Sequence, residues 1–174
     1  MKKLSCYLIV ILCVTTTFAQ KTDVEKKLKE MGLELISPPK PMANYVRAVR
    51  TGNLVYLAGH GPTRADGSNF TGKLGKDITI EQGYEAAKQT GIALLSSLKT
   101  EIGDLNKVKR FVKVLGMVNC TPDFTDQPKV INGFSDLMVS LYGEKGKHAR
   151  SAVGMISLPN NIAVEIEMIV EVEN

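Results

Sequence analysis

The chain has 174 residues, a formal net charge of +4, three cysteines and no tryptophan. A positive charge this small argues against a nucleic-acid or membrane-surface partner. Cys6 and Cys13 lie in an N-terminal segment that is predicted to be removed, so only Cys120 remains and an internal disulfide is excluded.

The N-terminus has the organisation of a secretory signal peptide. A basic start at residues 1–3 precedes an almost wholly apolar run over 4–14, and Ala19 is the small residue expected at a cleavage site. The apolar run is shorter than the about 20 residues of a membrane span. We therefore predict that residues 1–19 are cleaved on export, which makes the protein periplasmic or secreted without membrane contact. An uncleaved N-terminal anchor is the alternative.

Beyond the signal peptide, the apolar pattern predicts one domain. Residues 20–43 comprise a short helix and a proline-rich lead-in, and residues 44–174 form the domain itself. The first long helix begins with a capping box, Thr79 and Gln82, and the second has Pro128 near its start. The predicted elements are strands over 45–50 and 54–58, a glycine-rich loop over 59–75, a helix over about 80–101, a strand over 108–119, a helix over about 126–142 and two strands within 148–170.

The last two predicted strands carry most of the candidate chemistry. A strict period of two in the second strand places one apolar set against a core, namely Val164, Ile166, Met168 and Val170. Glu165 and Glu167 then lie on the opposite face. The Leu-Pro-Asn-Asn sequence at 158–161 predicts a turn that joins the two strands as a hairpin, with Arg150 at the start of the first strand.

This order of elements predicts an α+β fold of two layers, a mixed β-sheet with two helices packed on one of its faces. The other face of the sheet would stay uncovered in a monomer. The long predicted strand reads VKVLGMV and has apolar residues on both of its sides. We therefore expect the uncovered face to meet another subunit.

Motifs for several other chemistries are absent from the sequence. His60, His148 and Cys120 have no metal-ligand spacing, so no metal site is predicted. Ser151 lies in no G-x-S-x-G elbow, and the glycine-rich loop matches no phosphate-binding spacing. The basic run over 107–113 is interpreted as a solvated strand edge, not as a nucleic-acid site.

Arg150 and Glu165 remain as candidate functional residues. Arg150 stands between small residues, and its planar guanidinium suits two-bond capture of a ligand carboxylate. The alternative is that Arg150 pairs with a local carboxylate and has a structural role, which is the more common situation at a strand end.

Four segments of the sequence resemble the RidA/YjgF family of reactive enamine and imine deaminases, also called endoribonuclease L-PSP. They read NYVRAVRTGNLVYLAGHGP, FVKVLGMVNCTPDF, INGFSDLM and ARSAVGMISLP followed by VEIEMIVEVE, and they span roughly residues 40–172. The resemblance implies a chorismate-mutase-like fold and a homotrimer whose sheets form a central barrel. It also implies sites in the clefts between subunits.

The resemblance also implies roles for particular residues. Arg150 matches the arginine that binds the substrate carboxylate, and Glu165 the glutamate that helps to hold the catalytic water. Tyr45 matches the tyrosine before the first strand, Asn132 the asparagine of the second helix, and Gly59 the glycine of a Ser-Gly-Gln loop.

The chain departs from the family pattern at three other positions. Ala58 and His60 replace the serine and the glutamine of the Ser-Gly-Gln loop, and Ala152 replaces a frequent cysteine. His60 and Ala152 are nevertheless predicted to contact the substrate, together with Tyr45, Gly59 and Asn132. These changes leave the carboxylate-binding arginine in place and bear on which substrate fits.

The activity implied by the resemblance is hydrolysis of a 2-imino or enamine acid to a 2-keto acid and ammonia, without a cofactor. The expected partners are a small carboxylate-bearing substrate and two further copies of the chain. Two alternatives remain open: a non-enzymatic trimer that binds small carboxylates or proteins, and a ribonuclease, although no set of basic and general acid–base groups for RNA cleavage is visible.

Overall fold

The computed structural model describes residues 23–36, 43–64 and 66–173. The predicted signal peptide and most of the proline-rich lead-in lie outside these residues. Within them, no helix is long and apolar enough to cross a membrane. The elements run in the order α1 (Val24–Glu30), β1 (Ala48–Thr51), β2 (Leu54–His60), α2 (Ile80–Ile102), β3 (Val108–Asn119), α3 (Gln127–Tyr142), β4 (Ala149–Met155) and β5 (Val164–Val172), with short 3₁₀ turns at Leu105–Lys107, Gly143–Gly146 and Pro159–Asn161.

Local sequence signals account for most of these boundaries. Thr79 caps α2, and its side chain and that of Gln82 form the reciprocal bonds of the predicted capping box. Gly103, at φ +79°, ends the helix in a conformation that favours glycine. The long strand is confirmed with the predicted bounds, and α3 begins one residue later than predicted, with Pro128 in its first turn.

The five strands form one mixed sheet in the order β1-β2-β5-β3-β4. Neighbouring strands are antiparallel except for β3 and β4, which run parallel and are connected through α3. This arrangement follows from chain geometry, because parallel neighbours need a long crossover, usually a helix. The predicted α+β architecture with a mixed sheet is therefore confirmed.

The predicted hairpin between the last two strands is wrong. β3 lies between β4 and β5, and each of its two edges pairs with one of them. The turn signal itself is correct, because residues 159–161 form a 3₁₀ turn with Asn160 and Asn161 at positive φ. However, β5 is apolar and central, so it pairs with β2 and β3, and the turn only reverses the chain direction.

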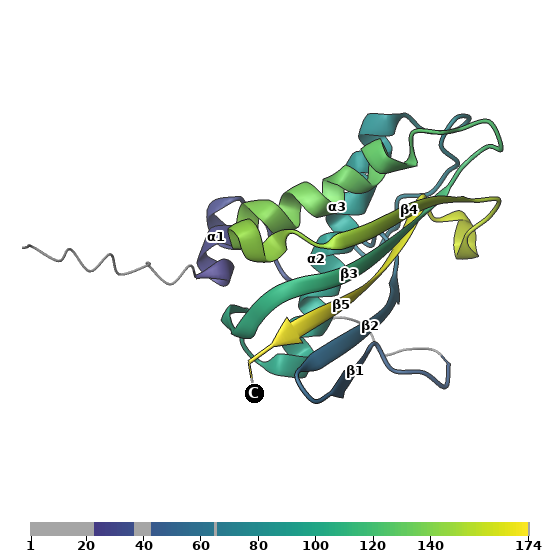
Figure 1. Cartoon of the computed structure of the whole chain (residues 1–174). Helices are drawn as coiled ribbons and strands as arrows, with labels where there is room; N and C mark the ends of the chain where they lie inside the picture. Colours follow the sequence, from purple (N-terminus) through teal and green to yellow (C-terminus); the bar gives the residue numbers. More distant parts are fainter. Residues whose placement is uncertain (1–22, 37–42, 65, 174) are drawn as a thin grey trace, which may run out of the picture.

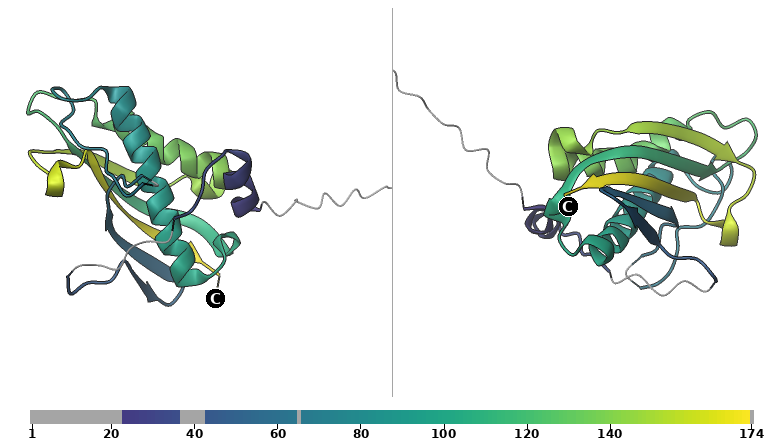
Figure 2. Two further views of the ribbon diagram at one scale, coloured as in Figure 1. Left: turned by 180° about the vertical axis from the view of Figure 1, so that it is seen from behind. Right: turned by 60° about the horizontal axis from the view of Figure 1, so that its bottom comes forward.

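The helices α2 and α3 pack together on one face of the sheet, and the core lies between the two layers (Figure 1; Figure 2). The alternating apolar set of β5 is at most 2% exposed, as predicted. Gly133 permits close contact between the helices, since a Cβ there would lie only 2.8 Å from the carbonyl carbon of Tyr84. This tight packing fixes where the polar residues of α3 stand relative to the sheet.

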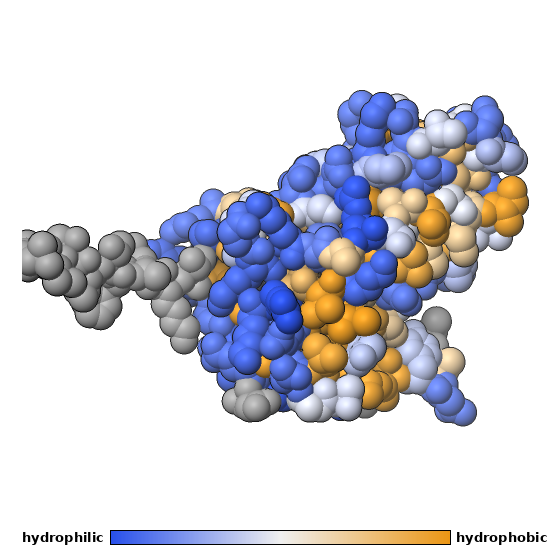
Figure 3. Space-filling view, in the orientation of Figure 1, coloured by the Kyte–Doolittle hydropathy of each residue, from blue (hydrophilic) through white to orange (hydrophobic). Residues whose placement is uncertain are grey.

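The opposite face of the sheet, here called the open face, is not covered by any described part of the chain. Val49, Tyr56 and Val153 are each at least 40% exposed on it. Figure 3 shows apolar side chains gathered over the strands, between hydrophilic regions. A hollow of about 540 Å³ lies on this face, and its lining includes Val49, Tyr56, Lys113, Leu115, Ser151 and Glu167. An apolar surface of this kind is typical of a protein–protein interface.

Candidate functional site

Arg150 lies on the edge strand β4 and points to the helix side of the sheet. It pairs in register with Val114, which is fully buried in the core, so both side chains lie on the same face. Its Nη1 donates hydrogen bonds to Oδ1 of Asn132 and to Oγ of Ser135, each at 2.9 Å. Asn132 and Ser135 are three residues apart on α3 and therefore share one face of that helix.

The partners of Arg150 are both neutral. Among the residues that the structure describes, Arg150 has no carboxylate partner, and its bonds use only Nη1. The N–H groups on Nε and Nη2 are then left for a ligand. By contrast, Arg110 on β3 donates from Nε to Glu171 at 2.7 Å. The interpretation of Arg150 as half of a local ion pair is therefore not supported, and an anion is the natural ligand of its positive charge.

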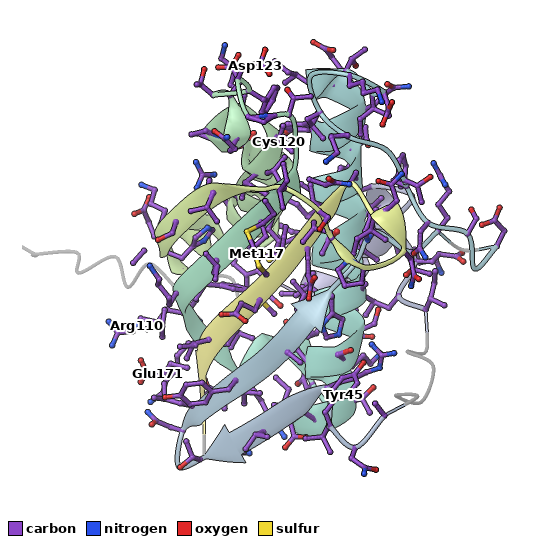
Figure 4. The ribbon with its side chains drawn as sticks, turned by 90° about the vertical axis from the view of Figure 1, so that its right-hand side faces the viewer. Tyr45, Arg110, Met117, Cys120, Asp123 and Glu171 are labelled. Carbon is purple, nitrogen blue, oxygen red and sulfur yellow. The ribbon has the colours of Figure 1, made fainter. Side chains whose placement is uncertain are left out.

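Glu165 lies on the open face of the sheet, beside Gly59. It pairs in register with Met117, near the centre of Figure 4. Gly59 lies at an irregularity of β2, and a Cβ there would overlap the Glu165 carboxylate, at 2.9 Å from Cδ. The absence of a side chain at Gly59 therefore lets the carboxylate lie directly against the backbone of β2. Burial and, to a smaller extent, the charge of Glu167 raise the pKa of Glu165.

Arg150 and Glu165 do not meet within one chain. Arg150 is aligned with Val114 and Glu165 with Met117, so they are three residues apart along β3 and lie on its opposite sides. At about 3.3 Å per residue and about 4.8 Å per strand, their α-carbons are about 14 Å apart. Their side chains also point to opposite faces of the sheet. Within one chain the two side chains therefore do not line a common cleft.

Two of the other predicted site residues, Asn132 and Ala152, lie on the same side of the sheet as the Arg150 side chain. Asn132 contacts Arg150 directly. Ala152 lies two residues beyond Arg150 on the same face of β4, opposite Gly116, and is partly buried against the core. Tyr45 precedes β1 and is 52% exposed, on the other side of the molecule from Arg110 and Glu171 in Figure 4.

His60 is the predicted site residue whose placement differs most from that of a ligand-binding group. Its ring is 4% exposed and lies on the helix side of β2. Nδ1 donates to the carbonyl oxygen of Ala58 at 2.7 Å, and Nε2 lies 2.7 Å from Oγ of Ser97 on α2. Burial lowers the pKa of His60. Both ring nitrogens are thus bonded inside the chain, and a substrate contact would require this pair to open.

Two residues of the Arg150 environment were not predicted from the sequence, namely Ser135 and His148. Ser135 could have been found from its spacing, because it lies one helical turn after Asn132 on the same face. His148 immediately precedes β4, and no local pattern connects it with α3. Its Nε2 lies 3.1 Å from Oγ of Ser135.

Glu165→Gln should make the isolated fold more stable at neutral pH. A carboxyl group whose pKa is raised by folding favours the folded state below its unfolded pKa, and this contribution is lost as the pH rises through the folded pKa. Ionised Glu165 is therefore unfavourable at pH 7, and a neutral amide removes that cost. Thermal unfolding at pH 7 and pH 4 should show an advantage of the variant that shrinks at the lower pH. An unchanged or lower melting temperature at pH 7 would contradict the burial argument.

Comparisons with known proteins agree with this architecture. Residues 25–172 match the model of the YjgF/chorismate-mutase-like family. The protein TCP17 of Trypanosoma cruzi is 40% identical over 152 residues, which cover 87% of this chain and 95% of that protein. A 2-iminobutanoate/2-iminopropanoate deaminase of Dermatophagoides farinae is 30% identical, over 78% of this chain and 91% of its own.

Solved structures show the same fold. The crystal structure of an Agrobacterium tumefaciens protein of unknown function has a TM-score of 0.81 and 40% identity, and covers 87% of this chain and 94% of that one. The chain belongs to the YjgF/chorismate-mutase-like family. A RutC family protein of Pyrococcus abyssi is 28% identical to it, over 75% of this chain and 88% of that protein.

Proposed function

We propose that the protein hydrolyses small 2-imino acids, and their enamine tautomers, to 2-keto acids and ammonia. The observation that carries this proposal is the environment of Arg150: a guanidinium on a strand edge, oriented by two neutral oxygens, with Nε and Nη2 left for a ligand. Such a group suits the planar carboxylate that every 2-imino acid carries. The relative from Dermatophagoides farinae, named as an iminobutanoate deaminase, supports the same reaction class.

The proposed reaction requires that the substrate and a water molecule are held in the right orientation and that a positive charge lies near the C=N group. Arg150 binds the substrate carboxylate and holds the adjacent protonated C=N group in place. Its positive charge also makes the C=N carbon more electrophilic. Glu165 orients a water molecule, which adds to this carbon. The resulting carbinolamine then releases ammonia and leaves the 2-keto acid. A protonated imine is already reactive, so placing the water and the carbon in contact supplies much of the rate increase.

We propose further that the site is shared between neighbouring copies in a homotrimer. Two observations support this arrangement: Arg150 and Glu165 face away from each other within one chain, and the open face that carries Glu165 is apolar and hollowed. If the β4 edge of one copy approaches the open face of the next, the arginine of the first and the glutamate of the second face the same cleft. The predicted signal sequence at residues 1–19 supports a place of action outside the cytoplasm.

The activity is tested with imino acids generated freshly by an amino-acid oxidase, in competition with semicarbazide. The protein should reduce semicarbazone formation because it removes the imine first. Unchanged semicarbazone yields, combined with measurable binding of 2-oxobutanoate, would favour a non-enzymatic carboxylate binder. RNA cleavage without an effect on the imine would favour a ribonuclease.

Mixing two inactive variants tests the shared site. Arg150→Ala and Glu165→Gln chains, unfolded together and reassembled in equal amounts, should regain about a quarter of the wild-type activity, because one interface in four then joins an intact arginine to an intact glutamate. Light scattering should give the mass of a trimer for each variant. A monomeric mass, or mixtures no more active than the separate variants, would contradict the shared site.

A further inference from the structure

A chain of hydrogen bonds continues from Arg150 into the protein. Ser135 Oγ, which accepts from Arg150, also lies 3.1 Å from Nε2 of His148. The other ring nitrogen of His148, Nδ1, lies 2.7 Å from the carbonyl oxygen of Gly146. The bonds therefore connect the guanidinium on β4 to a side chain of α3 and then to the 3₁₀ turn that precedes β4.

The donor and acceptor of each hydrogen bond in this series follow from its last group, the carbonyl oxygen of Gly146. A carbonyl oxygen can only accept, so Nδ1 of His148 carries the proton and donates to Gly146. In the neutral ring, Nε2 is then an acceptor, and the Ser135 hydroxyl donates to it. The lone pairs of Ser135 are in turn directed to Arg150. All donors point the same way, an arrangement in which successive hydrogen bonds strengthen one another.

Packing and charge around His148 both favour this neutral ring. The ring contacts Phe134 edge-on, with centroids 5.6 Å apart. Burial lowers the pKa of His148, and the charge of Arg150 lowers it further, so the ring is neutral at pH 7. Neighbouring lysines are engaged elsewhere: Lys147 pairs with Glu144 at 2.7 Å, Lys145 donates to the carbonyl oxygen of Val108, and Lys113 of β3 donates to Ser151 on the open face. Arg150 is therefore the charged group to which His148 responds.

We propose that His148 is a positioning residue for Arg150, which acts through Ser135 to hold the guanidinium with Nε and Nη2 turned toward the ligand carboxylate. This inference rests on the proposed function of Arg150 and adds two residues to it. The coupling is reciprocal. A carboxylate bound to Arg150 neutralises the charge that opposes protonation of His148, so ligand binding must make the imidazole easier to protonate.

NMR titration of the imidazole protons tests this coupling directly, because the whole sequence has two histidines. Addition of 2-oxobutanoate should raise the pKa of His148 by about half a unit or more. His60 is the internal control, since it is bonded to Ser97 in the core and should not respond. Arg150→Ala should raise the pKa of His148 in the free protein and abolish the response to the ligand.

Two substitutions of His148 separate positioning from mere stability. The amide nitrogen of His148→Asn can still donate to Gly146, but the variant loses the acceptor for Ser135. His148→Gln carries an amide oxygen near the position of Nε2 and can accept from Ser135. The asparagine variant should have a KM about 5- to 10-fold higher with kcat little changed, and glutamine should recover most of this loss. Ser135→Ala should resemble His148→Asn, and the double variant should be no worse than either single one.

The outcomes distinguish this inference from the function on which it rests. If wild-type protein binds no 2-oxobutanoate, or Arg150→Ala binds it equally well, the proposed function fails and the positioning role fails with it. If Arg150 is required for binding but the pKa of His148 does not change when the ligand is added, only the positioning role is overturned. Equal KM values for wild type, His148→Asn and His148→Gln, with a lower melting temperature in both variants, would likewise assign His148 to the fold alone.

Discussion

Arg150→Ala should lower kcat/KM for a 2-imino acid by roughly two orders of magnitude or more, because each charge-assisted hydrogen bond contributes about 1.5–3 kcal/mol and two are lost. The fold should survive, since Arg150 lies on the edge strand β4 and its partners on α3, Asn132 and Ser135, are neutral. Removing the guanidinium therefore leaves no unpaired charge behind. Initial rates at several imine concentrations, together with a thermal melt, measure both effects.

Two further variants test whether the loss of activity is specific to the guanidinium of Arg150. Arg150→Lys should recover only part of the activity, because an ammonium group cannot make the planar two-bond contact with a carboxylate. Arg110→Ala is the matched control: it removes an arginine of the neighbouring strand whose partner is Glu171, and it should retain activity. Full imine hydrolysis by a destabilised Arg150→Ala protein would show that Arg150 is structural.

Glu165→Gln should lower kcat about 100-fold with little change in KM, if the carboxylate orients water and does not bind substrate. The amide keeps the shape of the side chain but has lost the negative charge and one acceptor. Together with the expected gain in stability at neutral pH, this gives Glu165 the signature of a functional residue that is kept at a cost to the fold. A large rise in KM with unchanged kcat would instead place Glu165 in substrate binding.

Gly59→Ala tests the position of the Glu165 carboxylate without changing Glu165 itself. The new methyl group would overlap the Glu165 carboxylate and displace it from the backbone of β2, so turnover should fall although Glu165 is intact. Gly61→Ala is the control two residues away, where the nearest atom is the flexible end of Ile162 at 3.1 Å. Equal activity of the two variants would show that the position of Glu165 is not important for turnover.

The sequence by itself determined the elements and the two layers of this protein. Capping residues, glycine stops and the strict alternation along β5 are local signals, since each depends only on residues that are a few positions apart in the sequence. For the same reason, the residues that carry the resemblance to the family are recognisable along the chain alone. The two predicted helices, placed on one face of the sheet, likewise predicted that the other face stays uncovered by the chain.

Only the tertiary structure decided how the strands pair. The turn at 158–161 gave a correct reversal of direction but an incorrect hairpin, because pairing is set by which strands bury the most apolar surface together. β5 is apolar on its core face and takes a central position between β2 and β3, which leaves β4 to pair with β3. That choice depends on contacts between residues far apart in the chain, and no local pattern contains it.

The geometry of the candidate site was likewise decided at the tertiary level. The sequence identified Arg150 and Glu165, yet only the register against β3 shows that they face opposite sides of the sheet. Ser135 and His148 join the site because α3 packs closely against α2 at Gly133 and against the sheet at Gly116 of β3. Hydrogen bonds between side chains on different elements depend on this packing to within about an ångström, which is finer than any spacing along the sequence can specify.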